Sequence, residues 1–239
     1  RELVRVEADW VPSEPETSLY IRPFMFATEA SLGVHMANAY KFIVICCPVG
    51  AYYKEGVNPV RILVEDEYVR AVKGGTGFTK CGGNYAASIA GQVKAEKMGC
   101  SQVLWLDGVN RKYVEEVGTM NIMFKIDNEI YTAPIEGTVL PGVTRDSIIH
   151  ILRDWGYKVN ETHLSIDDLM KAGHEGRLEE AFGTGTAAVI SPVGEFIYRD
   201  DKVEVNGFKT GELTQKLYNY LTGIQWGTEE DKYGWIVEV

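Results

Sequence analysis

The sequence predicts a mixed α/β fold with a large share of antiparallel pairing. Strand-like runs outnumber helical segments, and several are separated only by a short turn, which is typical of β-hairpins. A few long amphipathic segments interrupt these runs and predict helices. Because strands and helices do not alternate regularly, the pattern does not fit a repeated βαβ array.

The first part of the chain predicts a loop and three strands. Residues 9–16 (DWVPSEPE) predict a loop or linker. Residues 19–27 alternate in polarity and predict a strand, which Pro23 places near a sheet edge. Residues 40–48 predict a buried strand, and residues 60–64 predict another.

A glycine-rich loop at residues 74–83 (GGTGFTKCGG) precedes the first predicted helix. Residues 85–98 predict that helix, and Gly99 predicts its end because glycine accepts the left-handed backbone conformation. Residues 102–106 predict a short strand. Residues 119–133 predict a hairpin that turns at an Asp-Asn pair.

The rest of the chain predicts, in order, a helix, a strand, a short helix, two strands on either side of glycines, a hairpin and a closing helix. Ser165, with Asp168 three residues later, predicts the capped start of the short helix. The other segments, in the same order, are residues 143–155, 157–163, the strands that flank 183–185, 193–205 and 212–221.

The composition is that of a soluble globular protein, since 45% of the 239 residues are apolar and 24% are charged. The 24 basic and 34 acidic side chains give a formal net charge of −10, which argues against binding to nucleic acid or to an anionic membrane. No apolar run in the sequence reaches the roughly 18 residues that span a bilayer, and the first residues do not resemble a signal peptide. We therefore expect a cytoplasmic protein.

The cysteines predict neither a metal site nor a disulfide framework. Cys46, Cys47, Cys81 and Cys100 form no CxxC pair in the sequence and have no histidine at metal-ligand spacing. We expect buried free thiols in a reducing compartment, and no bound metal.

Lys80 is the first candidate for chemistry. Glycines on both sides of it let a ligand approach the backbone closely, and the helix that follows brings the positive end of its dipole nearby. A lysine whose pKa is lowered in this way can form a Schiff base with an aldehyde. For any single lysine a solvated loop position is the more common alternative, and because these glycines match neither common nucleotide-binding pattern, a mononucleotide site has weak support.

Three further segments carry groups suited to a phosphorylated ligand. Residues 140–145 (LPGVTR) lead from a sharp turn into a helix, whose free N–H groups bind anions. Residues 183–187 (GTGTA) place hydroxyl and N–H groups in a tight turn, and Glu115 and Glu116 supply carboxylates. Each alone is more commonly an ordinary helix start, turn or solvated acidic pair. Together with Lys80 they are the parts that a pyridoxal phosphate site requires.

At these segments the sequence resembles the branched-chain amino acid aminotransferases, which belong to the fold-type IV pyridoxal phosphate enzymes. Seven strings in family order carry the resemblance, among them GGTGFTKCGGNYAAS, EVGTMNIMF and FGTGTAAVISPV. The strings occupy residues 18–34, 47–53, 74–88, 102–108, 116–124, 140–148 and 182–193. The resemblance implies the large domain of these enzymes, an α/β fold with mixed sheets in a pseudo-barrel flanked by helices.

The resemblance also implies which residues hold the cofactor, pyridoxal 5′-phosphate. Lys80 is expected to form the Schiff base and to move the Cα proton. Arg70 and Tyr85 are expected near the phenolic oxygen of the cofactor, and Glu116 at its ring nitrogen. The residues implied for the phosphate are Val143, Thr144 and Thr186. Those implied for the substrate are Tyr20, Thr119 and Ala187.

The function implied is a transaminase that transfers the amino group of L-leucine, L-isoleucine or L-valine to 2-oxoglutarate, giving glutamate. A homodimer and a role in branched-chain amino acid biosynthesis are part of this expectation. A D-amino acid aminotransferase or an aminodeoxychorismate lyase is the alternative within the fold. An inactive severed domain that acts only in dimerisation is the alternative from another class.

The resemblance sets the expected domain limits as well. We expect residues 1–17 to form an interdomain linker with the start of the large domain, and residues 18–239 to form the large cofactor-binding domain. None of the seven strings matches the N-terminal small domain of the family, so we expect that domain to be absent. The chain alone is then expected to bind the cofactor weakly and to turn over slowly or not at all.

Overall fold

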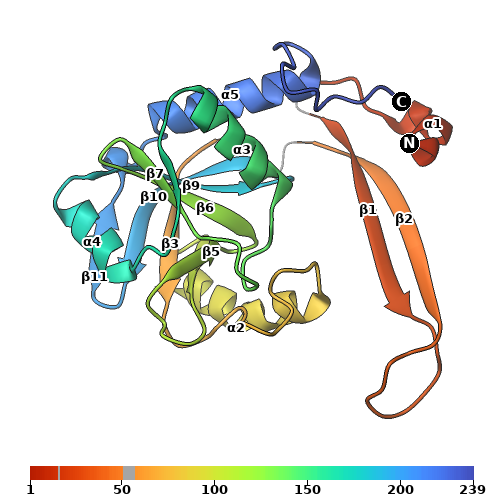
Figure 1. Ribbon diagram of the computed structural model, residues 1–239, viewed down its shortest axis with the longest axis horizontal. Helices are drawn as coiled ribbons and strands as arrows, with labels where there is room; N and C mark the ends of the chain where they lie inside the picture. The colour runs from red at the N-terminus through yellow and green to blue at the C-terminus, as the bar shows by residue number, and fades with distance from the viewer. Residues whose placement is uncertain (16, 51–56) are drawn as a thin grey trace. The chain divides into compact units, whose positions relative to one another are not determined.

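The computed structural model describes residues 1–15, 17–50 and 57–239 (Figure 1). Residues 51–53, which end one of the strings that carry the resemblance, lie outside the described residues. The chain divides into two compact units. The smaller unit comprises residues 1–56 with the last three residues, and the larger unit comprises residues 57–236. The domain limits expected at residues 17 and 18 stay a prediction.

The smaller unit is built on one antiparallel hairpin. A short helix α1 (Glu2–Val6) and a 3-10 helix η1 (Ala8–Trp10) precede β1 (Ser18–Ala27), which pairs with β2 (Tyr40–Val49). Both strands lie where the sequence predicts them. The expectation that the second strand is buried is wrong, since every residue of β2 is exposed or half-buried. A two-stranded sheet offers too little surface to bury its own side chains.

Six strands of the larger unit close into a barrel. In ring order they are β3 (Val60–Glu65), β4 (Gln102–Leu106), β5 (Val114–Val117), β6 (Met120–Ile126), β9 (Leu178–Gly185) and β10 (Val189–Tyr198). β3 runs parallel to both β4 and β10, and the other neighbours in the ring are antiparallel. The closed mixed barrel confirms the predicted fold class.

Three short strands extend the sheet beyond the ring. They are β7 (Glu129–Thr132), β8 (Val159–Glu161) and β11 (Asp201–Glu204). β7 pairs with β6 and β8, and β11 pairs with β10. A 3-10 helix, η2 (Asn206–Phe208), follows β11.

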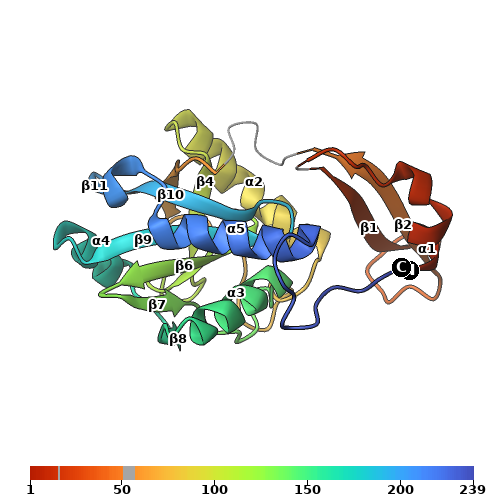
Figure 2. The ribbon, with the colours of Figure 1, turned by 90° about the horizontal axis from the view of Figure 1, so that it is seen from above.

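Two helices cover one side of the barrel, α3 (Val143–Asp154) and α5 (Glu212–Trp226) (Figures 1 and 2). Their apolar faces share a buried cluster with β9, in which Phe182, Ile148 and Leu217 are fully shielded from solvent. This cluster is the main core of the larger unit and fixes the direction of α3.

A third helix, α2 (Gly82–Lys97), packs over β3 and β4. Gly91 lies against the Trp105 ring, and a Cβ at this position would be 2.6 Å from a ring carbon, so the close approach requires glycine. Lys94 of the same helix reaches the buried carboxylate of Glu65, with 3.0 Å between Nζ and Oε1. Because of these two contacts, α2 is held firmly against the barrel.

Several predicted turns and caps are confirmed. The hairpin of β6 and β7 turns at residues 127–128, where φ is 49° and 59°. At the start of α4 (Ile166–His174), the Ser165 hydroxyl oxygen accepts a hydrogen bond from the backbone N–H of Asp168 at 3.0 Å. Gly99 follows the end of α2 with a φ of 71°.

Other expectations are wrong in their limits. The glycines of residues 183–185 end β9 instead of separating two strands, because Met120 packs against Gly183 and Gly185 and leaves no room for a side chain. The turn lies at residues 186–188. β8 is shorter than predicted, α5 continues to Trp226, and β5 was not predicted as a strand.

All four cysteines are free thiols, but the expectation that they are buried is wrong for three of them. Cys100 is buried beneath α2, whereas Cys47 is exposed and Cys46 and Cys81 are half-buried. The adjacent pair Cys46–Cys47 lies in β2, whose apolar run is uncovered within its own unit.

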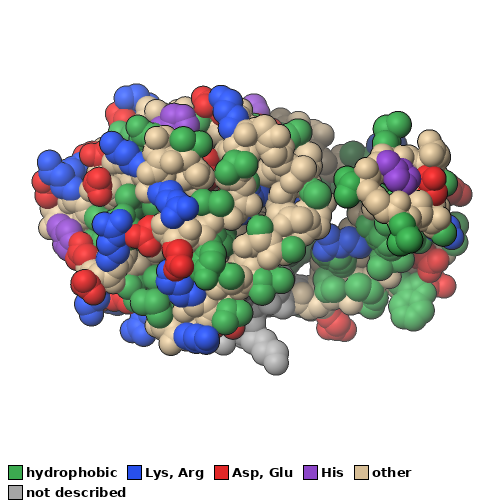
Figure 3. All heavy atoms as spheres, turned by 90° about the horizontal axis from the view of Figure 1, so that it is seen from below, with side chains coloured by type: hydrophobic (Ala, Val, Ile, Leu, Met, Phe, Trp, Pro, Cys, Tyr) green, Lys and Arg blue, Asp and Glu red, His purple; other side chains and the backbone are tan. Residues whose placement is uncertain are grey.

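The charged side chains of the larger unit are mixed. On the face that Figure 3 shows, Lys and Arg alternate with Asp and Glu instead of gathering in patches of one sign. Within the described ranges, no helix has both the length and the apolar character that a bilayer crossing needs.

Replacing Phe182 by alanine tests the main core. The Phe182 ring is fully buried, so Phe182→Ala should lower the free energy of unfolding by about 3–5 kcal/mol through the cavity it leaves. Val109, which is 77% exposed, provides the control: Val109→Ala should change the same quantity by less than about 0.5 kcal/mol. Urea denaturation measures both, and similar losses for the two variants would contradict the assigned core.

Candidate active site

Glu116 lies at the centre of the candidate site. Its side chain is 3% exposed, and its Oε2 atom is 2.7 Å from Nε of Arg70. The Oε1 atom accepts hydrogen bonds from the backbone N–H of Leu140 at 2.9 Å and from the side-chain amide of Asn121 at 3.2 Å. Asn121 is the direct partner of Glu116 across the β5–β6 pair, which explains why the two side chains meet.

Burial raises the pKa of Glu116 to about 7, although the Arg70 guanidinium and the Leu140 N–H favour the charged carboxylate. The charge of Lys80 also acts on this carboxyl group, so the lysine belongs to the same neighbourhood. A carboxyl group of this kind can exchange a proton near neutral pH or hold a cationic N–H. The solvated acidic pair considered from the sequence is therefore wrong for Glu116.

Arg70 connects Glu116 to the glycine-rich loop. One terminal nitrogen of Arg70 donates to the carbonyl of Thr138 at 2.9 Å, and the other donates to the carbonyl of Gly77 at 3.1 Å. Gly77 lies so close to the next segment that a Cβ there would be 2.4 Å from the Thr138 carbonyl oxygen. Arg70 thus holds the loop before Lys80 against the segment that leads to α3.

Lys80 lies at the end of that loop, just before the first turn of α2. Cys81 is the N-cap of α2, so the predicted placement of the lysine ahead of a helix is confirmed. The Lys80 side chain is exposed, and its Nζ atom lies 5.8 Å from the centre of the Tyr85 ring. The loop therefore presents the Lys80 side chain at the surface, next to the Tyr85 ring.

The start of α3 offers unpaired backbone N–H groups. Gly142 is its N-cap, and within the described residues no side chain accepts from the first turn. Val143 is 74% exposed there and Thr144 is buried. Asn121 lies so close to Gly142 that a Cβ would be 2.1 Å from the Asn121 Oδ1 atom. The helix start is therefore held beside Glu116 by their common neighbour, Asn121.

A buried hydroxyl group, that of Thr184, lies at this end of the barrel. Thr184 is 1% exposed, and its Oγ1 atom makes no hydrogen bond within the described part of the chain. Thr184 pairs with Asn121 across β6 and β9. An unpaired buried hydroxyl group costs about 1–3 kcal/mol, so this atom is suited to a bound polar group.

Two turns complete this end of the barrel. Thr119 lies in the turn between β5 and β6, and Thr186 and Ala187 lie in the turn between β9 and β10. Because β6 and β9 are antiparallel with Asn121 opposite Thr184, both turns lie at the same end as Glu116. All three residues are exposed.

Tyr20 is the one predicted site residue in the smaller unit. It lies in β1, where its hydroxyl group accepts a hydrogen bond from Arg22. Its expected place beside the substrate stays a prediction, as do the roles expected of the other site residues.

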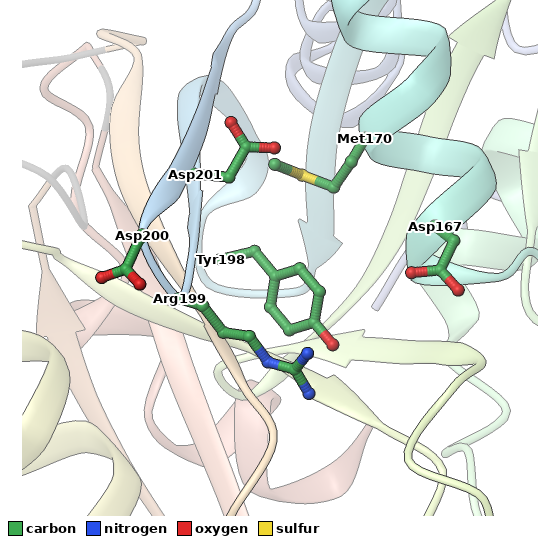
Figure 4. A pocket seen from close by; sticks show the side chains of 6 residues that line it. All are labelled: Asp167, Met170, Tyr198, Arg199, Asp200 and Asp201. Atoms are coloured by element: carbon green, nitrogen blue, oxygen red, sulfur yellow. The ribbon is translucent and has the colours of Figure 1, made fainter.

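Two surface hollows are lined by other residues. One of about 460 Å³ lies between α4 and the turn from β10 to β11, and the second, of about 560 Å³, lies between the end of α3 and α5. The first is lined by Asp167, Met170, Tyr198, Arg199, Asp200 and Asp201 (Figure 4). Since neither hollow includes a predicted site residue, the contacts around Glu116 define the candidate site.

Asn121 and Thr184 were not predicted as site residues. Both lie in strings that carry the family resemblance, EVGTMN and GTGTA, so the signal was present in the sequence. Their importance follows from the β6–β9 register and from burial, which a single sequence does not reveal.

The chain matches the family model of class IV aminotransferases over residues 5–196. It is 55% identical over 239 residues to branched-chain-amino-acid aminotransferase 2 of Bacillus subtilis, covering all of this chain and 66% of that protein. It is 54% identical over 240 residues to a probable branched-chain-amino-acid aminotransferase of Staphylococcus aureus, covering 67% of that protein. The chain thus spans about two thirds of the length of these relatives.

Solved structures of similar fold carry related names. A branched-chain amino acid aminotransferase of Escherichia coli superposes with a TM-score of 0.78 at 30% identity, over 92% of this chain and 70% of that one. A T.th. branched-chain amino acid aminotransferase with pyridoxamine 5′-phosphate superposes with a TM-score of 0.81 at 28% identity, over 99% of this chain and 72% of that one.

The raised pKa of Glu116 predicts a pH-dependent stability. A group with a raised pKa in the folded state binds its proton more tightly there than in the unfolded chain, so its contribution to stability is complete below about pH 4.5 and is lost as the pH rises through about 7. Glu116→Gln should remove this component of the pH dependence. Urea midpoints measured across this range test it, with the exposed Glu230→Gln as control. An unchanged pH profile in Glu116→Gln would contradict the raised pKa.

Proposed function

Because this chain belongs to the class IV aminotransferase family, we propose that it carries the cofactor site of a branched-chain amino acid transaminase. The observation that supports this most directly is the buried Arg70–Glu116 pair, which brings the glycine-rich loop of Lys80 together with the start of α3. Since the chain spans about two thirds of its relatives, the activity of the whole protein is part of the proposal.

The residues present fit pyridoxal 5′-phosphate, the cofactor of this family. Lys80 would hold its aldehyde carbon as a Schiff base, and Glu116 would face its ring nitrogen. The N–H groups at Val143 and Thr144, which no side chain of the described residues caps, suit a phosphate dianion, and the Thr186 hydroxyl group lies at the same end of the barrel. The buried hydroxyl group of Thr184, for which the described part of the chain offers no partner, supports this fit independently. When bound, the cofactor supplies a ring that withdraws electrons from the substrate Cα.

The protein's own groups would then bind and orient the substrate and move a proton. Once displaced by the substrate amine, the Nζ amine of Lys80 would take the proton from the substrate Cα and later return it. The Glu116 carboxylate would keep a proton at the ring nitrogen, and its bonds from Arg70 and Leu140 hold the carboxylate in place. The backbone N–H of Ala187 is proposed to bind the substrate carboxylate, with Thr119 nearby.

The proposed donors are L-leucine, L-isoleucine and L-valine, and the proposed acceptor is 2-oxoglutarate, which gives glutamate. The names of the relatives support the donors. The acceptor and a homodimeric state rest on the family resemblance alone, and a cytoplasmic location stays an expectation from the sequence.

Borohydride reduction tests the role of Lys80. After incubation with pyridoxal 5′-phosphate and reduction, mass spectrometry of the digested protein should locate the added group on Lys80. Lys80→Ala should lose this label, whereas Lys73→Ala, which removes an exposed lysine directly before the same loop, should keep it. A label that persists in Lys80→Ala would overturn the assignment.

Amino transfer tests the substrate class. The full-length protein should transfer the amino group of L-leucine to 2-oxoglutarate, and Lys80→Ala should abolish the transfer. Preference for D-alanine over L-leucine would instead identify a D-amino acid aminotransferase.

A further inference from the structure

The loop that ends at Lys80 is held together by one carbonyl group. The Thr76 carbonyl oxygen accepts a hydrogen bond from the backbone N–H of Thr79 at 3.0 Å and another from the Thr79 hydroxyl group at 2.8 Å. These bonds close a single tight turn directly before the lysine. Such a turn sets the path of the backbone but does not attach it to the rest of the protein.

Asn84 attaches the turn to α2. Its side chain is buried at 6% exposure, and its Nδ2 amide donates to the carbonyl groups of Thr76 at 2.7 Å and Thr79 at 2.9 Å. Its Oδ1 atom accepts from the Thr76 hydroxyl group at 2.7 Å. Only this orientation of the amide satisfies two carbonyl acceptors and a hydroxyl donor together.

The bond to Thr79 acts on the lysine itself. The Thr79 carbonyl belongs to the peptide group that joins Thr79 to Lys80. By binding this carbonyl, Asn84 fixes the orientation of the peptide plane that leads into the Lys80 Cα. Asn84 is the third residue of α2, and it reaches back to the loop although the first turn of the helix has no side-chain cap in the described residues.

The helix that carries Asn84 is attached to the barrel by two contacts. α2 is held to the barrel by the Lys94–Glu65 ion pair and by the contact of Gly91 with Trp105. On its other side the loop is held by the bond from Arg70 to the Gly77 carbonyl. The backbone before Lys80 is therefore attached to the barrel on two sides, through α2 and through Arg70.

We propose that Asn84 is a positioning residue that sets the direction in which Lys80 presents its amine. This inference rests on the proposed role of Lys80. Without the Asn84 amide, the Thr79 carbonyl loses this donor and the Thr76 carbonyl keeps only its bonds within the turn. The peptide before Lys80 is then free to rotate, and the amine no longer stays in one place relative to Glu116.

Variants of the full-length protein separate positioning from attachment. Asn84→Ala removes all three hydrogen bonds, and Asn84→Asp keeps the shape but places a carboxylate against two carbonyl groups. Thr76→Val removes only the bond to Oδ1. Ser88→Ala, which removes a hydroxyl group that bonds within α2, is the control.

In Asn84→Ala and Asn84→Asp, borohydride should still attach pyridoxal 5′-phosphate to Lys80. The visible circular dichroism of the bound cofactor should weaken, because the amine no longer holds one orientation. The kcat should fall by roughly 10- to 100-fold with a much smaller change in KM, because a small misplacement of the reacting group slows the chemical step. Thr76→Val should show a weaker form of the same changes, and Ser88→Ala should show neither.

A loss of stability without change in the dichroism and in kcat would show a merely structural role and overturn the proposal. Failure of wild-type protein to become labelled at Lys80 would instead reject the proposed function. Thr76→Val removes a single hydrogen bond to the Asn84 amide. The dichroism and kcat can therefore be measured in this variant even if the Asn84 variants fold poorly.

Discussion

The candidate site depends on keeping one carboxylate out of water. A buried charge is stable only when its oxygen atoms have close partners, and Glu116 has an arginine on one oxygen and two N–H donors on the other. These partners come from the segment before the glycine-rich loop, from β6 and from the segment before α3. Satisfying one carboxylate therefore requires the β5–β6 hairpin to meet two segments that are distant from it in the sequence, those of Arg70 and Leu140. Arg70 also connects the glycine-rich loop to the segment before α3, because its terminal nitrogens donate to the carbonyl groups of Gly77 and Thr138.

Closure of the barrel explains why the remaining groups lie at one end. β9 pairs with both β6 and β10, so the turn after β9 and the turn before β6 are forced to the same rim. The contact of Met120 with Gly183 and Gly185 keeps these strands close. The ends of the strands thus present hydroxyl and N–H groups around Glu116, while α3 and α5 pack on the outside of the wall.

Local features of the sequence predicted much of the fold. The turn at residues 127–128, the Ser165 cap and the glycine after α2 depend only on neighbouring residues, and all three are confirmed. The four-residue strand β5 was missed because so short a run has little periodicity of its own. The burial of β2 was predicted wrongly because an apolar run shows that a strand is suited to burial but does not show whether another part of the chain packs on it.

The candidate site was predictable only in part. The strings that resemble the family pointed to Lys80 and Glu116, and the place of Arg70 ahead of the lysine matched an arginine of the family. The structure brings Arg70 and Glu116 into direct contact. The sequence did not show that Glu116 is buried or that Asn121 joins it to the start of α3. Both facts arise from strand register, which links residues by pairing across the sheet.

The two sheets differ in how many unpaired strand edges they offer to another chain. Each of the six strands in the ring is paired on both sides, so the ring offers no template to which another chain could add a strand. β1 and β2 form a ribbon with an open edge along each strand and with exposed apolar side chains such as Met25, Phe42 and Ile45. Apart from the short strands β8 and β11 at the two ends of the larger sheet, the open strand edges of the described residues therefore belong to this ribbon, where they lie beside exposed apolar side chains.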